Sequence, residues 1–358
     1  RETQIQWALE RVRARTMAMH KSDELPETSH ILFEQMKELG EPVEQLTIGI
    51  VNEENHVIEI SATLLGDTLN KIYCHSIDEP YMMAKVYKAW KKQQKTLVVE
   101  LRGDELNAYN QYRNELTNSK IFPTDLGKEQ QRIVYAAFFS KGMLALGANE
   151  TRPPESLQLL VKFSSVFALT YTRFLDLQKA EAQAREAQIE AGLERVRSKT
   201  MAMHSSEDVS AATATMFIEL ERLNIQNFRG GIVNIRHDQT MEVWSVNTLE
   251  DGSIIRAVGD FDMKMHPFWL QLYTGWVNKD EFFEFNMVGK VKEDYIEILN
   301  TRRDYLPNGM QQLPDCHVQS YFFGEGAIWT FSLQSHSEQD KQVMKRFASV
   351  FSLTFRRY

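Results

Sequence analysis

The chain carries one twelve-residue sequence twice, as LERVRARTMAMH from Leu9 and as LERVRSKTMAMH from Leu193, 184 residues later. The same offset relates FSSVFALTYTRF from Phe163 to FASVFSLTFRRY from Phe347, and it relates FFSKG to FFGEG. Matches at one fixed period mark a duplicated structural unit. A chain of 358 residues is also too long for one ordinary core. We therefore predict two domains of the same fold, whose sequences differ most between the matching segments.

Charge and cysteine content narrow the class of protein. The 49 acidic residues exceed the 41 basic ones and no basic cluster is visible, which argues against a nucleic-acid partner. No apolar run approaches the length of a membrane span, so no membrane contact is expected within this chain. With only Cys74 and Cys316, a disulfide framework is excluded and a reducing cytoplasm is the expected location. The opening RETQIQWALERVR starts in mid-pattern, as expected of a segment from a longer protein.

Each copy shows the same order of helical and strand-like patterns. In the first copy, helices are expected to begin near Ser22, Pro80, Asp104 and Pro154. Alternating, β-branched runs such as TIGIVN, HVIEISATL and TLVVEL predict strands between them. The order helix, three strands, helix, strand, helix, two strands, helix predicts an antiparallel sheet flanked by helices, which is an α+β fold.

The helices at the ends of the copies set the predicted domain boundaries. The segment RFLDLQKAEAQAREAQIEAGLERVRSKTMAM lacks proline and is rich in good helix formers, so one long continuous helix is expected to join the domains. The predicted segments are a connector helix over 1–21, a first domain over 22–174, a second connector helix over 175–205 and a second domain over 206–358.

Both connector helices carry apolar residues at alternating spacings of four and three, which is the heptad-like pattern that pairs parallel helices. We therefore predict a parallel homodimer. The predicted dimer contacts are Ile5, Leu9, Val12, Met19, Ile189, Leu193, Val196 and Met203. Lys179 and Glu186 interrupt this seam upstream of Ile189, so the pairing is expected to be marginally stable. The alternative is that each connector helix packs on its own domain.

Together, the element order and the LERVRARTMAMH segment resemble the GAF family of small-ligand sensor domains, which occur in tandem in bacterial signalling proteins; the PAS fold would give a similar pattern. The connector is similar to helices that precede a histidine kinase, a cyclase or a phosphatase. The resemblance covers roughly residues 22–171 and 206–358 and the helical joint. It implies modules of a two-component or related system that dimerise through terminal helices and pass a ligand signal to an output domain of the same polypeptide. No output domain lies within these residues.

The pair Cys316-His317 lies just before a strand-like run, VQSYFFGEGAIW. Phytochrome-type GAF domains attach a bilin at a Cys-His pair in a similar place. The first copy has Arg132 and Ile133 at the matching positions, which favours a structural cysteine beside a surface histidine. A bilin photosensor through Cys316 remains a less favoured alternative.

Catalytic patterns are missing from the sequence. The nine histidines form no spacing typical of a metal site, and neither a nucleophile elbow nor a phosphate-binding loop is present. His20 and His204 lack the following acidic residue of a phosphoacceptor box and are explained by their place near helix ends. We expect neither a resident metal nor an enzyme active site in this chain.

The aromatic residues of the second copy are the remaining candidates for a ligand site, because pockets are usually apolar with a few polar groups. The predicted ligand-binding residues are Trp244, Trp269, Tyr273, His317 and Trp329. The leading hypothesis is a non-catalytic tandem sensor whose ligand shifts the packing of the terminal helices. The alternative from another class is a ligand-free dimerisation scaffold. The sequence identifies neither the ligand nor the output domain, and it favours the second copy slightly as the binder.

Overall fold

A computed structural model describes residues 1–358 except 41–44, 63–71, 249–253, 307–309, 311 and 356–358. The chain divides into two compact units, unit 1 (Arg1–Ala182) and unit 2 (Gln183–Tyr358). The division falls within α5 (Pro154–Met201), one helix of 48 residues. The predicted continuous helix between the two domains is therefore confirmed.

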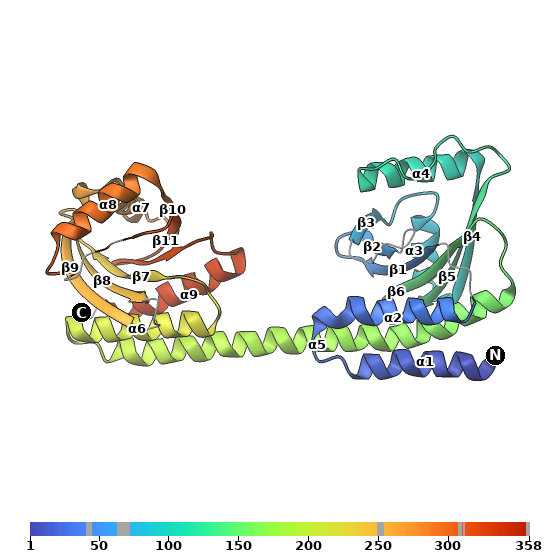
Figure 1. Ribbon diagram of the computed structural model, residues 1–358, viewed down its shortest axis with the longest axis horizontal. Helices are drawn as coiled ribbons and strands as arrows, with labels where there is room; N and C mark the ends of the chain where they lie inside the picture. The colour runs from blue at the N-terminus through green and yellow to red at the C-terminus, as the bar shows by residue number, and fades with distance from the viewer. Residues whose placement is uncertain (41–44, 63–71, 249–253, 307–309, 311, 356–358) are drawn as a thin grey trace. The chain divides into compact units, whose positions relative to one another are not determined.

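Unit 1 folds into a six-stranded antiparallel sheet with the strand order β3-β2-β1-β6-β5-β4 in its described part. Three strands before α3, one strand before α4 and two strands before α5 follow the predicted order (Figure 1). The elements that precede α5 are α1 (Glu2–Met17), η1 (Ser22–Glu24), α2 (Leu25–Glu38), β1 (Gln45–Asn52), β2 (Val57–Ala62), β3 (Ile72–Ser76), α3 (Met83–Lys91), β4 (Thr96–Arg102), α4 (Gly103–Thr117), β5 (Gln131–Phe139) and β6 (Gly142–Ala148).

Unit 2 repeats this arrangement with the strand order β10-β11-β12-β7-β8-β9. Its elements after α5 are α6 (Ser206–Arg222), β7 (Arg229–Ile235), β8 (Thr240–Thr248), β9 (Ile254–Asp262), η2 (Met263–Met265), α7 (Pro267–Asn278), β10 (Phe282–Met287), α8 (Gly289–Thr301), β11 (Cys316–Phe323), β12 (Gly326–Ser332) and α9 (Glu338–Phe355). Two antiparallel sheets with flanking helices confirm the predicted α+β class.

The central strand pairs of the two sheets have the same register. Gln45 of β1 lies opposite Gly147 of β6, and Arg229 of β7 lies opposite Phe331 of β12, so each pair is related by the 184-residue offset. The sheets therefore correspond residue by residue along these strands. A side chain in one unit can be compared directly with its counterpart in the other.

Each sheet buries both of its faces against helices. In unit 1, Leu144 and Leu146 of β6 point into a core shared with α1, α2 and the first part of α5. Met143 and Ala145, which alternate with them along the strand, point into a second core under α3 and α4. Figure 1 shows α4 on the opposite side of the sheet from α2 and α5. Unit 2 is built in the same way, with α6, α9 and the last part of α5 on one face and α7 and α8 on the other.

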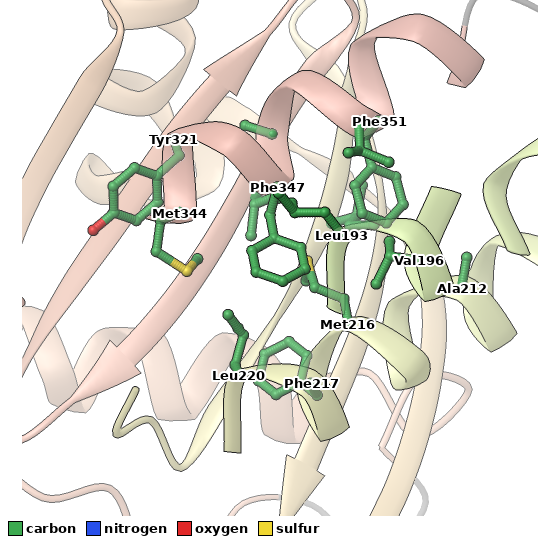
Figure 2. Close-up of a cluster of buried hydrophobic side chains, with 14 of the residues drawn as sticks. Leu193, Val196, Ala212, Met216, Phe217, Leu220, Tyr321, Met344, Phe347 and Phe351 are labelled. Carbon is green, nitrogen blue, oxygen red and sulfur yellow. The ribbon is translucent and has the colours of Figure 1, made fainter. Parts of the chain in front are cut away.

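The predicted dimer seam lies inside these cores, and its assignment to a dimer interface is therefore corrected. Figure 2 shows Leu193 and Val196 of α5 packed beside Phe347 and Phe351 of α9. All eight seam residues pack inside their own units, in two sets: Ile5, Leu9, Val12 and Met19 in unit 1, and Ile189, Leu193, Val196 and Met203 in unit 2. Ile5 is partly buried and the other seven are buried. The spacing of four and three gives a helix one apolar stripe, and here the stripe faces the helices and sheet of its own unit.

Helix α6 is capped by Ser205, through a reciprocal capping box with Asp208. Ser22 begins the short helix η1, and α2 starts three residues later at Leu25. Within the described parts of the chain, none of the helices combines the length and apolarity needed to cross a bilayer.

Candidate ligand pocket

Unit 1 contains a pocket between its sheet and the helices α3 and α4. It leaves about 70 Å³ for the centres of water-sized molecules, which is room for several waters or a small organic molecule. Its walls are Gln45, Thr47, Ile60, Ala62, Tyr73, His75, Met82, Met83, Val86, Tyr109, Arg113, Thr117, Phe122, Arg132, Val134, Met143, Ala145 and Gly147. Among the described residues, the walls include two arginines and one histidine, and no aspartate or glutamate.

A buried carboxylate positions the methionines of α3. Glu79 accepts hydrogen bonds from the backbone N–H groups of Tyr81, Met82 and Met83 at 2.8, 2.9 and 2.8 Å. These donors have no partner within the helix, so the carboxylate stabilises its first turn. Helix α3 begins at Met83, three residues after Pro80, where the sequence predicted its start. Met82 and Met83 are thereby fixed on the pocket wall.

Arg113 of α4 is the most unusual side chain of the pocket. Its guanidinium carbon lies 3.5 Å from the centroid of the Phe122 ring and 5.5 Å from that of Tyr109. No acidic side chain of the described residues forms an ion pair with it within 4.0 Å. Burial lowers the pKa of Arg113 to about 10, and the charge of Arg132 acts in the same direction. Arg113 is still a cation at neutral pH, so the pocket holds a desolvated positive charge.

Arg132 of β5 brings a second positive charge to the pocket. Its guanidinium donates to the side-chain oxygens of Gln45 at 2.8 Å and Asn149 at 3.2 Å, which fix its position. Gly147 of β6 leaves the space that Arg132 occupies, since a Cβ atom at this residue would lie 2.3 Å from the Arg132 Nη2 atom. Any larger residue at this position would displace the arginine.

His75 and Tyr109 supply neutral polar groups. Burial, and then the charge of Arg113, lowers the pKa of His75 to about 4, so its imidazole is uncharged at neutral pH. Its Nδ1 atom is buried and has no hydrogen-bond partner among the described residues. Burial raises the pKa of Tyr109 to about 12, so this side chain remains a phenol. The pocket can therefore donate hydrogen bonds, and its described walls carry no negative charge.

The equivalent space in unit 2 is largely filled by aromatic side chains. It leaves only about 20 Å³ for the centres of water-sized molecules. The shared register puts Trp329 and Phe331 of β12 where unit 1 has Ala145 and Gly147 of β6. In the same register, Cys316 of β11 takes the place of Arg132.

The arginine of α4 has no counterpart in α8. Both helices start at a glycine with positive φ, Gly103 at 50° and Gly289 at 55°. Counted from these glycines, Tyr109 corresponds to Tyr295, and Arg113 corresponds to Leu299. Leu299 also lines the small cavity of unit 2. Unit 2 thus keeps the buried tyrosine but has no arginine at the position of Arg113; its own buried arginine, Arg229 of β7, lies 5.6 Å from the centroid of the Tyr295 ring.

The five predicted ligand-binding residues do not form one site, and this prediction is corrected. Trp269 and Trp329 line the small cavity of unit 2. Trp244 lies on the other face of the sheet, where it packs on Phe355 and donates to Ser206 Oγ at 2.8 Å.

The two polar members of the predicted set also lie elsewhere. Tyr273 does not line the cavity, and its hydroxyl donates to the His237 carbonyl at 3.2 Å. His317 alternates with Cys316 along β11 and points away from the cavity, with Nδ1 3.2 Å from Glu284 Oε1. The larger, charged pocket is in unit 1, and sequence reasoning missed its residues His75, Tyr109, Arg113 and Gly147.

Cys316 is buried in the core under α7 and α8. Burial raises the pKa of its thiol to about 11, so it is not a thiolate at neutral pH. Cys316 is not among the residues that line the small cavity of unit 2. Among the residues that the structure describes, no three His, Cys, Asp or Glu side chains are placed to hold a metal ion.

No protein-family model matches the chain, and no curated protein matches it. Among solved structures, it is similar to a bacteriophytochrome from the photosynthetic bacterium R. palustris, with 10% sequence identity and a TM-score of 0.38. The alignment covers 91% of this chain and 61% of the bacteriophytochrome, so the chain spans less than two thirds of that protein.

Proposed function

We propose that this chain is the sensory region of a signalling protein and that unit 1 binds its small-molecule ligand. One observation supports this most directly. The same place on two copies of one fold is an open, charged pocket in unit 1 and a space filled by Trp329 and Phe331 in unit 2. A pocket kept open beside a partly buried, unpaired cation costs free energy unless a ligand occupies it. Unit 2 then serves a structural role within the sensory region.

The two faces of β6 offer a route by which ligand binding reaches α5. Ala145 and Gly147 face the pocket, whereas Leu144 and Leu146 pack in the core that contains Leu160 and Phe163 of α5. A ligand that shifts β6 therefore changes the packing of the helix on the opposite face. In this proposal the helix adopts two packings, the ligand favours one, and α5 carries the difference to an output domain of the same polypeptide. Dimerisation through the eight seam residues is not part of the proposal.

The test compares the protein with a variant whose pocket is filled as in unit 2. Ala145→Trp introduces the tryptophan that unit 2 carries at this position, and Leu169→Trp adds a tryptophan at a side chain that is 57% exposed. Each protein is incubated with a bacterial metabolite extract and examined by native mass spectrometry, with circular dichroism to verify folding. The wild type and Leu169→Trp should carry a small mass that leaves on denaturation, and Ala145→Trp should not. A wild type without added mass, or equal masses on all three proteins, would contradict the proposal.

A further inference from the structure

Building on the binding function proposed above, we propose that the ligand of unit 1 is a small organic carboxylate. Its acid group lies beside Arg113 and Arg132, and its apolar part contacts the methionine side chains of the pocket. The charge, the stacking geometry and the apolar lining of the pocket support this inference.

The charge of Arg113 is not balanced by the described residues around it. Buried charges elsewhere in the described chain differ in how they are held. Glu219, whose side chain is 3% exposed, accepts from both Arg195 and Arg222. Arg229 of β7, which is 2% exposed, instead lies over the rings of Tyr295, Trp329 and Phe331 and forms no ion pair with a described acidic residue. Arg113 resembles Arg229 in this respect, since it donates to none of the described side chains and no acidic residue is among the described residues of its pocket wall, but it lines a pocket with room for a ligand. Burying a charge is costly unless a counter-charge accompanies it. An anionic ligand supplies the counter-charge that the described protein lacks.

The stacking of Arg113 leaves its hydrogen-bonding edge available. Phe122 covers one face of the guanidinium at 3.5 Å, and the N–H groups of a guanidinium lie in its plane, away from such a ring. The planar fork of N–H donors matches the two oxygens of a carboxylate. Arg132, held in place by Gln45, adds a fixed positive charge to the same pocket without needing to move.

The rest of the pocket selects an organic ligand over an inorganic ion. Met82, Met83 and Met143 line the pocket together with Val86 and Ile60. Methionine side chains adapt to the shape of an apolar group. A bare inorganic anion would leave this apolar surface against water, whereas the hydrocarbon part of an organic acid would cover it.

The experiment compares each acid with its uncharged amide. Isothermal titration calorimetry is carried out with acetate, butyrate and benzoate, with acetamide, butyramide and benzamide, and with inorganic phosphate. The proteins are the full chain, Arg113→Leu and Arg256→Leu. Leucine is the residue that unit 2 has at the position of Arg113, so this variant removes a buried charge and is expected to fold. Arg256 is an exposed arginine of β9 and provides the matched control.

At least one carboxylate should bind the full chain about ten- to a hundredfold more tightly than its amide, as expected for a charge-assisted hydrogen bond. Arg113→Leu should abolish this preference, and Arg256→Leu should retain it. Equal affinity for acid and amide, binding of phosphate alone, or an unchanged preference in Arg113→Leu would each overturn the inference. If no probe binds, the carboxylate inference fails, while the metabolite experiment with Ala145→Trp still decides whether the pocket binds a ligand.

Discussion

At the scale of single residues, unit 1 differs from unit 2 by a few side chains that keep a pocket open and polar. Small residues on β6, Ala145 and Gly147, leave the space, and Arg113 and His75 give it its electrostatic character. Because burial controls the protonation of both ionisable groups, unit 1 is a cationic pocket at neutral pH with a neutral histidine.

The buried histidine predicts how the stability of unit 1 depends on pH. The pKa of His75 is about 4 in the folded chain and about 6.5 when unfolded. Above pH 6.5 both states are neutral and His75 has no effect. As the pH falls below 6.5 the unfolded chain binds a proton that the folded chain excludes, so the free energy of unfolding decreases. The loss should be about 2 kcal/mol between about pH 7.5 and about pH 5.

Urea unfolding of unit 1 at these two pH values measures the effect. His75→Gln should lose about 2 kcal/mol less than the wild type, whereas His30→Gln, a change at an exposed residue of α2, should match the wild type. His266 and His336, whose pKa values are also lowered by burial, are present in all three proteins and do not affect the comparison. A wild-type pH dependence equal to that of His75→Gln would show that His75 is not buried as described.

At the scale of elements, the order of strands and helices could be predicted from the sequence, but the partners of the helix faces could not. Alternating, β-branched runs such as TIGIVN form strands, and the uninterrupted helix formers around Glu186 produce α5. A spacing of four and three describes an apolar stripe on a helix and does not say what covers it. Leu193 and Val196 therefore fit a dimer seam and a domain core equally well by sequence.

The pocket of unit 1 could not be predicted from the sequence, for a related reason. A pocket is defined by side chains that are small, and Ala145 and Gly147 are unremarkable in a strand. The aromatic residues led us to predict the ligand site in unit 2, although large side chains fill a cavity rather than leave it open. The signal that was available is the difference between the copies at the fixed offset, where Ala145 and Gly147 face Trp329 and Phe331. Arg113 carried no comparable signal, because its burial depends on the packing of α4.

The reassigned seam predicts the effect of a core substitution. Leu193 is 3% exposed among α6 and α9 side chains, so Leu193→Ala should destabilise unit 2 by about 2–5 kcal/mol. Leu353→Ala, at a residue of α9 that is 71% exposed, should change the stability by less than about 0.5 kcal/mol. Urea unfolding at several protein concentrations is the measurement. The decrease in the free energy of unfolding caused by Leu193→Ala should be independent of protein concentration. A decrease that depends on concentration would indicate that Leu193 lies in a dimer interface.

A second prediction at this scale concerns the ion pair between α5 and α6. Arg195 donates to both oxygens of the buried Glu219 at 2.7 Å, so Arg195→Ala leaves that carboxylate only Arg222. The expected loss is about 1–3 kcal/mol. In unit 1, the equivalent Arg11 contacts the neutral Gln35 and an exposed carboxylate, that of Glu38, so Arg11→Ala should cost less than about 1 kcal/mol. Comparable losses in thermal unfolding of the two variants would contradict this account.

At the scale of the whole molecule, two copies of one fold share one helix but have different interiors. Unit 1 combines an open pocket with a strand, β6, whose opposite face packs on α5, while unit 2 has a filled interior. This division of roles is the central claim: the ligand acts in unit 1, and α5, which begins in unit 1, is the element that carries the change.

Hydrogen exchange followed by mass spectrometry tests this claim most directly, because it reports the protection of every segment in the full chain. The exchange is compared with and without saturating amounts of the carboxylate probe that binds most tightly. We predict slower exchange in α4, β5, β6 and the first part of α5, and no change in β11, β12 or α8. Protection centred on the aromatic residues around Trp329 in unit 2, or no change anywhere in unit 1, would contradict the account.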